Sequence, residues 1–117
     1  MRLLLLGTHP AIDFLRPLLE RHYELVDAGG SPAALVAFGV GANVPHTVDR
    51  VIHVTDDPHG VMPVAKTLVI GATPPTAEVS HARLTTDHPA ELLSLIDGFL
   101  RYPDRFPVGV TREAAAV

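Results

Sequence analysis

Short, unbroken runs of apolar residues that stop at a glycine are the feature that most constrains the fold of this chain. Residues 3–6 are four consecutive leucines followed by Gly7, and residues 67–71 read TLVIG. Such runs are typical of strands buried on both faces, because a strand with one solvent-facing side alternates apolar and polar residues. The sequence therefore predicts a parallel sheet that is covered on both faces.

Two segments beside these runs carry apolar residues at helical spacing. The first begins near Pro10, a residue that suits the first turn of a helix, and the second begins near Asp87 or His88. Their apolar faces consist of Ile12, Leu15, Leu18 and Leu19 in the first segment and of Leu92, Leu95, Ile96 and Phe99 in the second. Strands that alternate with helices predict a doubly wound α/β sheet with helices on both faces.

The expected fold is a single flavodoxin-like α/β domain with a mostly parallel, five-stranded sheet. Its strands are expected near residues 2–6, 23–27, 50–55, 67–71 and 82–85. The apolar segment Ala33–Phe38 is expected to form a short helix, although periodicity alone does not separate a short buried helix from a strand. The domain is expected to span residues 1–102, followed by an irregular tail over residues 103–117 that contains proline and glycine.

The composition narrows the possible functions. The chain has 117 residues, 9 Lys and Arg against 13 Asp and Glu, a formal net charge of −4, and no cysteine. The acidic balance argues against nucleic-acid binding by this domain alone. The lack of cysteine excludes disulfides, thiol catalysis and thiolate metal sites. The N-terminal apolar run is too short for a signal peptide or a membrane span, so we expect a cytoplasmic protein with no membrane contact.

The order of these segments resembles the receiver domain of two-component response regulators. A receiver's first strand, first helix and second strand are matched by RLLLLGTHPAIDFLRPLLERHYELVDA, and its third strand and following loop by DRVIHVTDDPHG. Its fourth strand is matched by TLVIGATPP, and its fifth strand and final helix by ARLTTDHPAELLSLIDGFLR. The resemblance covers about residues 2–101 and rests on layout more than on signature residues.

The resemblance also implies what the phosphorylation pocket should contain, and this chain departs from it. A receiver holds Mg²⁺ and a phosphoaspartate with an acid pair, an aspartate, a hydroxyl and a lysine at successive strand ends. The matching positions here are Gly7–Thr8 or Thr8–His9, Val54 or Thr55, Thr73, and Thr85 or Thr86. Only the hydroxyl, Thr73, fits. Since Mg²⁺ requires carboxylate oxygens, the resemblance implies a pseudo-receiver that is not phosphorylated in the usual way, unless Asp56 or Asp57 replaces the aspartate.

The carboxyl ends of the predicted strands form the candidate ligand pocket, because open parallel sheets bind ligands there. The candidate pocket residues are Gly7, Thr8, His9, Thr55, Asp56, Asp57, Thr73 and Thr86. Imidazoles and carboxylates gather near the third strand, and this mixture of ligands suits zinc. The candidate metal ligands are His53, Asp56, Asp57 and His59, with His46 upstream. The alternative is that these are ordinary surface or partly buried side chains.

Three functions follow from these observations and remain open. The first is a non-catalytic regulatory or protein-interaction module that needs no cofactor and contacts a protein partner or a second copy through its final helix. Its expected contact residues are Leu93, Ile96, Leu100 and Tyr102. The second is a small Rossmann-like nucleotide-binding domain, similar to the start of NAD-dependent sugar epimerases, although a glycine-rich turn and a Tyr-x-x-x-Lys pair are missing. The third is a His/Asp metal-binding protein.

Overall fold

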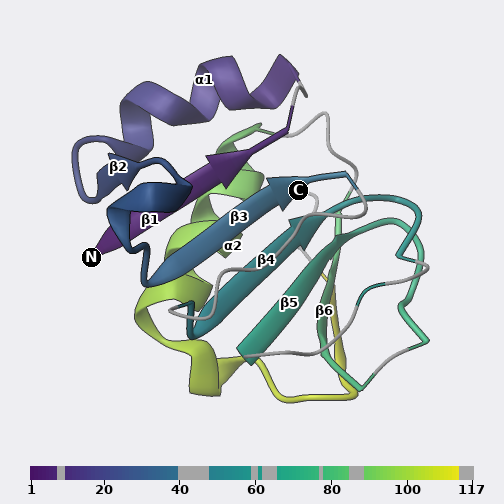
Figure 1. Ribbon diagram of the computed structural model, residues 1–117. Helices are drawn as coiled ribbons and strands as arrows, with labels where there is room; N and C mark the ends of the chain where they lie inside the picture. Colours follow the sequence, from purple (N-terminus) through teal and green to yellow (C-terminus); the bar gives the residue numbers. More distant parts are fainter. Residues whose placement is uncertain are drawn as a thin grey trace.

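A parallel sheet with both long helices on one of its faces forms the protein (Figure 1). The computed structural model describes residues 1–7, 10–39, 48–58, 61, 66–76, 78–84 and 89–113. Its strands are β1 (Arg2–Leu6), β2 (Glu24–Val26), β3 (Ala34–Phe38), β4 (Arg50–Val54), β5 (Lys66–Gly71), β6 (Ser80–Arg83) and β7 (Thr111–Glu113). Its helices are α1 (Pro10–Leu19), α2 (Pro89–Arg101) and the short 3₁₀ helices η1 (Ala28–Gly30) and η2 (Pro103–Arg105).

The predicted α/β class and parallel sheet are confirmed, but the expected number of strands is wrong. The sheet has seven strands in the order β2-β1-β3-β4-β5-β6-β7, and every neighbouring pair is parallel. The segment expected to be a short helix is instead β3, which lies between β1 and β4. Leu35 and Val36 point to opposite faces of β3 and both are fully buried. Burial on both faces of the strand explains the unbroken apolar run, since a helix that packs through one face would need apolar residues on that face alone.

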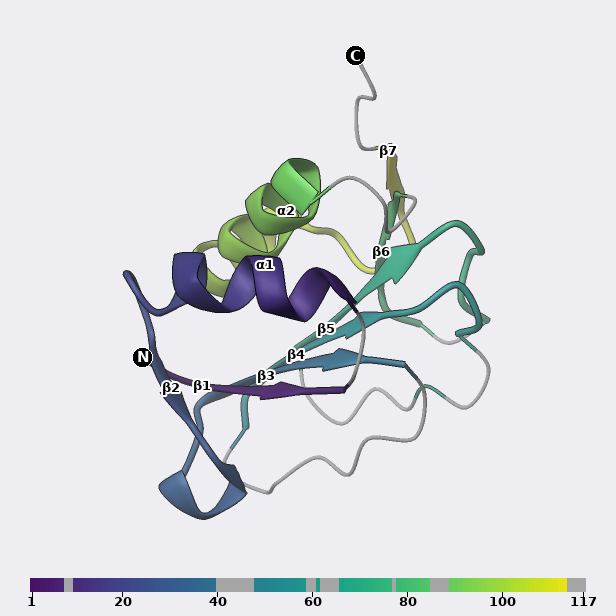
Figure 2. The ribbon, with the colours of Figure 1, turned by 90° about the horizontal axis from the view of Figure 1, so that it is seen from above.

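Both α1 and α2 pack on the same face of the sheet (Figure 2), so the expectation of helices on both faces is wrong for the described residues. One apolar cluster joins Leu15 of α1 and Phe99 of α2 to side chains of β1, β3, β4, β5 and β6. On the opposite face, Val48, Val61 and Val79 from the connecting segments contact the strands. In the described part of the chain, no helix combines the length and hydrophobicity that crossing a membrane requires.

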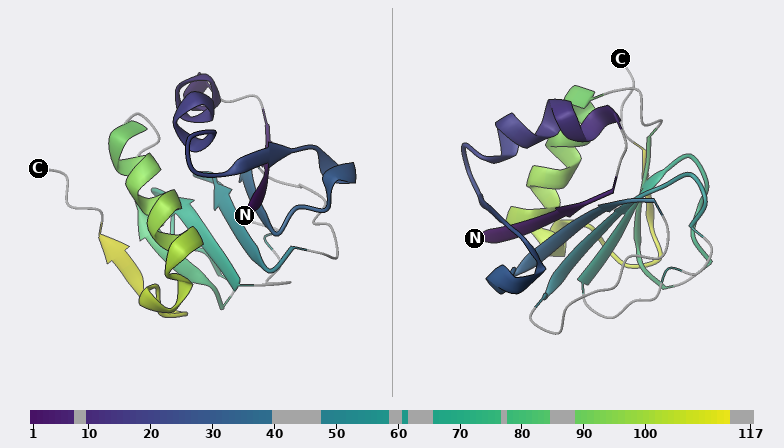
Figure 3. Two further views of the ribbon diagram at one scale, coloured as in Figure 1. Left: turned by 90° about the vertical axis from the view of Figure 1, so that its left-hand side faces the viewer. Right: turned by 45° about the horizontal axis from the view of Figure 1, so that its top comes forward.

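The C-terminal segment, expected to be irregular, contributes η2 and the edge strand β7 (Figure 3). The crossover from β1 to β2 and the crossover from β6 to β7 move toward opposite edges of the sheet, while their helices lie on the same face. The two crossovers therefore have opposite hands, and one departs from the right-handed rule. His81 and Arg83 of β6 hold β7 in place, through a contact of 3.1 Å from His81 Nδ1 to Thr111 Oγ1 and an ion pair to Glu113.

Two glycines allow neighbouring strand ends to approach closely at the carboxyl edge of the sheet. Gly7, which has φ 113°, follows β1, and a Cβ at this position would lie 2.5 Å from the carbonyl oxygen of Phe38. A Cβ on Gly71, the last residue of β5, would overlap the carbonyl oxygen of Thr55. Side chains at either position would push the strand ends apart.

We predict that Gly71→Ala lowers the free energy of unfolding by about 3 kcal/mol, because the new methyl group would have to displace backbone of the adjoining strand. Gly98→Ala is the matched control. Its Cβ would lie 3.6 Å from Phe106, an ordinary contact, and a helical Gly to Ala change stabilises by about 0.5–1 kcal/mol. Urea unfolding of both variants measures the difference, and equal effects of the two changes would contradict the proposed close approach.

Candidate functional site

The carboxyl edge of the sheet contains the point at which the chain changes direction across the sheet. From β1 the chain passes to β2 on one side, and from β2 it returns across β1 to β3 on the other. Open α/β sheets bind ligands at such switch points, beyond the ends of the two strands that flank the switch point, which are β1 and β3 in this sheet. Here those strands are followed by Gly7 and Gly39, which both have positive φ, and a Cβ on Gly39 would meet nothing within 4 Å. The described backbone therefore leaves open space beside β3.

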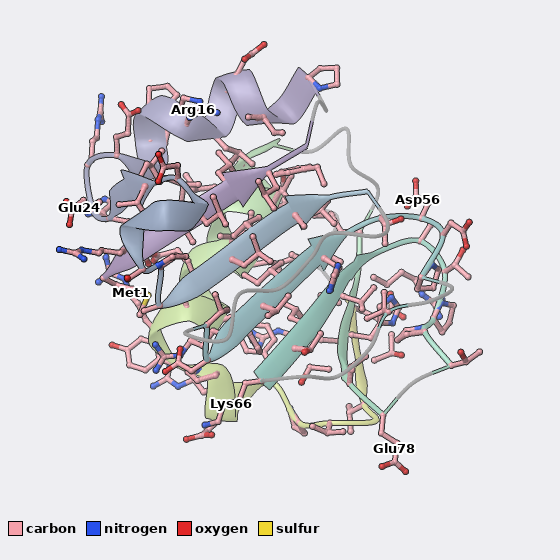
Figure 4. The ribbon with its side chains drawn as sticks, in the orientation of Figure 1. Met1, Arg16, Glu24, Asp56, Lys66 and Glu78 are labelled. Carbon is pink, nitrogen blue, oxygen red and sulfur yellow. The ribbon has the colours of Figure 1, made fainter. Side chains whose placement is uncertain are left out.

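The turns after β4 and β5 are tied together by side chains that the sequence placed in the candidate pocket. Asp56, labelled at this edge in Figure 4, accepts a hydrogen bond from the backbone N–H of Ala72 at 3.0 Å. Thr55 Oγ1 accepts one from the backbone N–H of Asp57 at 3.0 Å and lies 3.1 Å from the Asp57 carbonyl oxygen. Asp56 thus links the two turns, Thr55 stabilises the turn after β4, and Thr73 is exposed beside them.

The structure brings together part of the predicted pocket. Thr55, Asp56, Asp57 and Thr73 lie on neighbouring turns, and Gly7 lies at the same edge on β1. The remaining predicted members, Thr8, His9 and Thr86, lie outside the described residues.

The candidate metal ligands are not assembled within the described part of the chain. His53 is buried inside β4, whereas Asp56 and Asp57 are exposed at the strand end. No group of three or more potential ligands there could hold a metal ion. His59 and the upstream His46 lie outside the described residues. The metal site stays a prediction.

Two buried histidines occupy one row across the face of the sheet that lies opposite the helices. His53 pairs with Val69, and Val69 pairs with His81, so the histidines are two strands apart, about 10 Å. His81 contacts Thr111 through Nδ1 and the Gly71 carbonyl oxygen through Nε2, both at 3.1 Å. Among the residues that the structure describes, His53 Nδ1 has no hydrogen-bond partner. Burial lowers the pKa of both histidines below 6.5.

A hollow of about 270 Å³ between α1 and α2 is a second candidate site, which sequence reasoning missed. It is lined by Leu18, Leu19, Arg21, His22, Tyr23, Ala90, Leu93, Ser94 and Asp97. The Tyr23 hydroxyl donates to Asp97 Oδ1 at 2.6 Å, and Arg101 Nε donates to the same oxygen at 2.9 Å. Tyr23 and Asp97 are 74 positions apart, so no local pattern reveals the pair.

The polar groups of this hollow stabilise each other's ordinary charge states. Burial, together with the hydrogen bond to Asp97, raises the pKa of Tyr23 to about 12. Burial opposes ionisation of Asp97, but the hydrogen bonds from Tyr23 and Arg101 outweigh it and lower the pKa of the carboxyl group. At neutral pH the phenol is therefore protonated and the carboxylate is charged, and the phenol is a hydrogen-bond donor, not a base.

The predicted contact residues of the final helix divide into two groups. Ile96 and Leu100 are fully buried in the cluster against the sheet, so the prediction that they contact a partner is wrong. The apolar residues of α2 cover more than one narrow stripe of the helix, and Ile96 and Leu100 belong to the side that packs against the sheet. Leu93 is partly buried and lines the hollow. Tyr102 is 52% exposed, with the guanidinium of Arg105 4.4 Å from the centre of its ring.

Asp27 is a further residue that sequence reasoning missed. It follows β2 directly, twenty positions after Gly7, and it is exposed. In dinucleotide-binding sheets an acidic residue at about this distance from the first glycine binds the ribose hydroxyls. Its side chain does not cap η1. The spacing from Gly7 was the available signal.

The comparisons with known proteins give no relative from which a role could be transferred. No protein-family model matches the chain, and neither a search of curated proteins nor a search of solved structures finds a match.

We predict that the two buried histidines respond differently to replacement by leucine. His53→Leu should leave the free energy of unfolding at pH 7.5 unchanged or raise it by up to about 1 kcal/mol, because an unpaired buried polar atom is removed. His81→Leu should lower it by about 1–3 kcal/mol, because two contacts are lost. Chemical unfolding measures the free energy of unfolding of both variants. A large decrease in His53→Leu would contradict the conclusion that His53 Nδ1 is unpaired.

The same variants test the pH dependence of stability. The pKa of His53 is lower in the folded than in the unfolded chain. The folded state therefore keeps its full free energy of unfolding above pH 6.5, where His53 is neutral in both states, and loses part of it as the pH falls from there toward the folded pKa. The unfolding free energy of His53→Leu should therefore decline less between pH 7 and pH 5.5 than that of the parent chain. An unchanged slope would show that His53 does not titrate on unfolding.

Proposed function

We propose that this protein is a non-catalytic protein-interaction module of regulatory type, as the receiver-like layout implies, and that it contacts its partner across α1 and α2. The observation that carries the proposal is the hollow between these helices. Its apolar lining includes Leu18 and Leu93, and the lining residues Ala90 and Ser94 are exposed. An apolar depression between two exposed helices suits a protein contact better than chemistry.

The size and polar groups of the hollow also favour a protein side chain as its occupant. Its volume of about 270 Å³ is close to the lower limit of the range of about 300–1,000 Å³ that is usual for small-molecule sites, so a single side chain suits it better than a large ligand. Asp97 already accepts hydrogen bonds from Tyr23 and Arg101, so an apolar group can enter without leaving this carboxylate unpaired. Apolar anchors set in such pockets provide most of the energy of many protein contacts.

Site-specific photo-crosslinking tests the proposal. A photoreactive residue at Ser94, on the exposed rim of the hollow, should give a defined adduct in cells that produce the protein naturally, and Leu93→Glu should abolish the adduct. The matched control position is Thr73, exposed at the carboxyl edge of the sheet. Absence of an adduct at position 94, or equal adducts at both positions, would count against a contact surface on α1 and α2.

A nucleotide-binding function is the second candidate, and the arrangement at the carboxyl edge favours it. Gly7 and Gly39 follow the strands on either side of the switch point, and Asp27 follows the next strand outward. Glycine turns that admit phosphates and an acid that binds ribose have these places in dinucleotide-binding sheets. The second and third glycines of that fingerprint are His9 and Ile12 in this chain.

A thermal-shift screen with NAD, NADP, ATP and FMN decides this second candidate. A ligand at 100 times its Kd stabilises the fold by about 2.7 kcal/mol, which is a shift of several degrees in a domain of this size. Asp27→Ala should raise the Kd for NAD about tenfold and so reduce the thermal shift. Glu78→Ala, at the opposite edge of the sheet (Figure 4), should leave the Kd unchanged. No shift with any nucleotide would eliminate the candidate.

A further inference from the structure

A protruding aromatic side chain lies beside the hollow that α1 and α2 form. Phe14 of α1 is 48% exposed. It precedes Leu18, one of the residues that line the hollow, by four positions. Residues four apart on a helix are neighbours on the same side, so Phe14 stands on the part of α1 that borders the hollow. The helix layer thus presents an apolar projection and an apolar depression next to each other.

We propose that two copies of this chain associate through α1 and α2, with Phe14 of each copy seated in the hollow of the other. The inference rests on the proposed interaction function and names its partner as a second copy. A two-fold dimer contact is self-complementary, because each patch meets the same patch of the partner. A projection and a depression placed side by side on one surface satisfy this requirement, since a half-turn brings each onto the other.

The chemistry of the hollow matches the group that would enter it. The phenyl ring of Phe14 has no polar atom, and the Asp97 carboxylate, which lines the hollow, already accepts hydrogen bonds from Tyr23 and Arg101. The apolar lining comes from both helices, from Leu18 and Leu19 on one side and from Leu93 on the other. Seating Phe14 therefore buries apolar surface on both copies, which is the main source of affinity in such a contact.

The charges along α1 fit the same arrangement. In the proposed dimer the two-fold axis is perpendicular to α1 and passes beside Phe14, so the two α1 helices are antiparallel and the first turn of one approaches the last turn of the other. Asp13 lies in the first turn beside Phe14, and Arg21 lies just after the last turn, where it lines the hollow. Arg16 lies two positions from Phe14 and therefore faces another side of the helix, so Arg21 is the basic residue that approaches Asp13 of the second copy. Opposite charges at the rim of a contact favour this register.

Light scattering of the purified chain tests the proposal. The parent should have twice the chain mass of 12.5 kDa, and Phe14→Asp should raise the dissociation constant at least about thirtyfold, because a buried anchor becomes a charge. Val108→Asp is the matched control. Val108 is 64% exposed and lies away from the hollow between α1 and α2, so this variant should remain a dimer. A parent that is monomeric at every concentration, or equal effects of both variants, would overturn the proposal.

Single cysteines give a second, geometric readout, because the chain has none of its own. Asp13→Cys and Arg21→Cys are both exposed substitutions. When the two variants are mixed under mild oxidation, they should form a mixed disulfide dimer faster than either variant forms its own. A statistical mixture of the three dimers would overturn the antiparallel arrangement.

The photo-crosslinking at position 94 separates failure of this inference from failure of the proposed function. An adduct of twice the chain mass supports self-association. A monomeric chain whose adduct contains a different protein overturns the dimer and leaves the interaction function in place. A monomeric chain with no adduct removes both.

Discussion

Packing of α1 and α2 against one face of the parallel sheet is the interaction on which the rest of the structure depends. Ile52 and Ile70 of the central strands meet Leu15 of α1 and Phe99 of α2 in a single apolar cluster. Phe106 extends the cluster beyond α2, with its ring edge-on to Phe99 at 5.5 Å. Because one layer of helices and one sheet share this cluster, the gap between the helices and the path of the C-terminal segment past Phe106 depend on it.

Much of the fold could be predicted from the sequence, because burial on both faces leaves a direct mark. Unbroken apolar runs identified β1, β4 and β5, and helical spacing identified α1 and α2. β3 was missed because four consecutive buried residues followed by a partly buried one have no periodicity that separates a strand from a helical turn. β7 was missed because Thr111–Glu113 has no buried side chain, and its place depends on contacts with His81, Arg83 and the ring of Phe106, over which Arg112 lies at 4.8 Å.

One candidate site could be predicted from short segments of the sequence, and the other depends on residues that lie far apart in it. That the ends of parallel strands gather polar side chains follows from topology, and Thr55, Asp56 and Thr73 do lie at one edge of the sheet, while their role in a ligand pocket stays a prediction. The hollow depends on the angle and separation of two helices and on a hydrogen bond between residues 74 positions apart, and neither is encoded in a short segment. Likewise, composition does not show that His53 Nδ1 has no partner within the described part of the chain while His81 has two contacts.

The two outermost strands, β2 and β7, have three residues each, and this brevity has a consequence for the behaviour of the protein at high concentration. The unpaired N–H and C=O groups of an edge strand are a template on which other chains can aggregate. Between these short edges, the long apolar strands β3, β4 and β5 have neighbours on both sides. The segments most prone to form intermolecular β structure are thus enclosed within the sheet, and charged residues such as Glu24 and Arg112 occupy its margins.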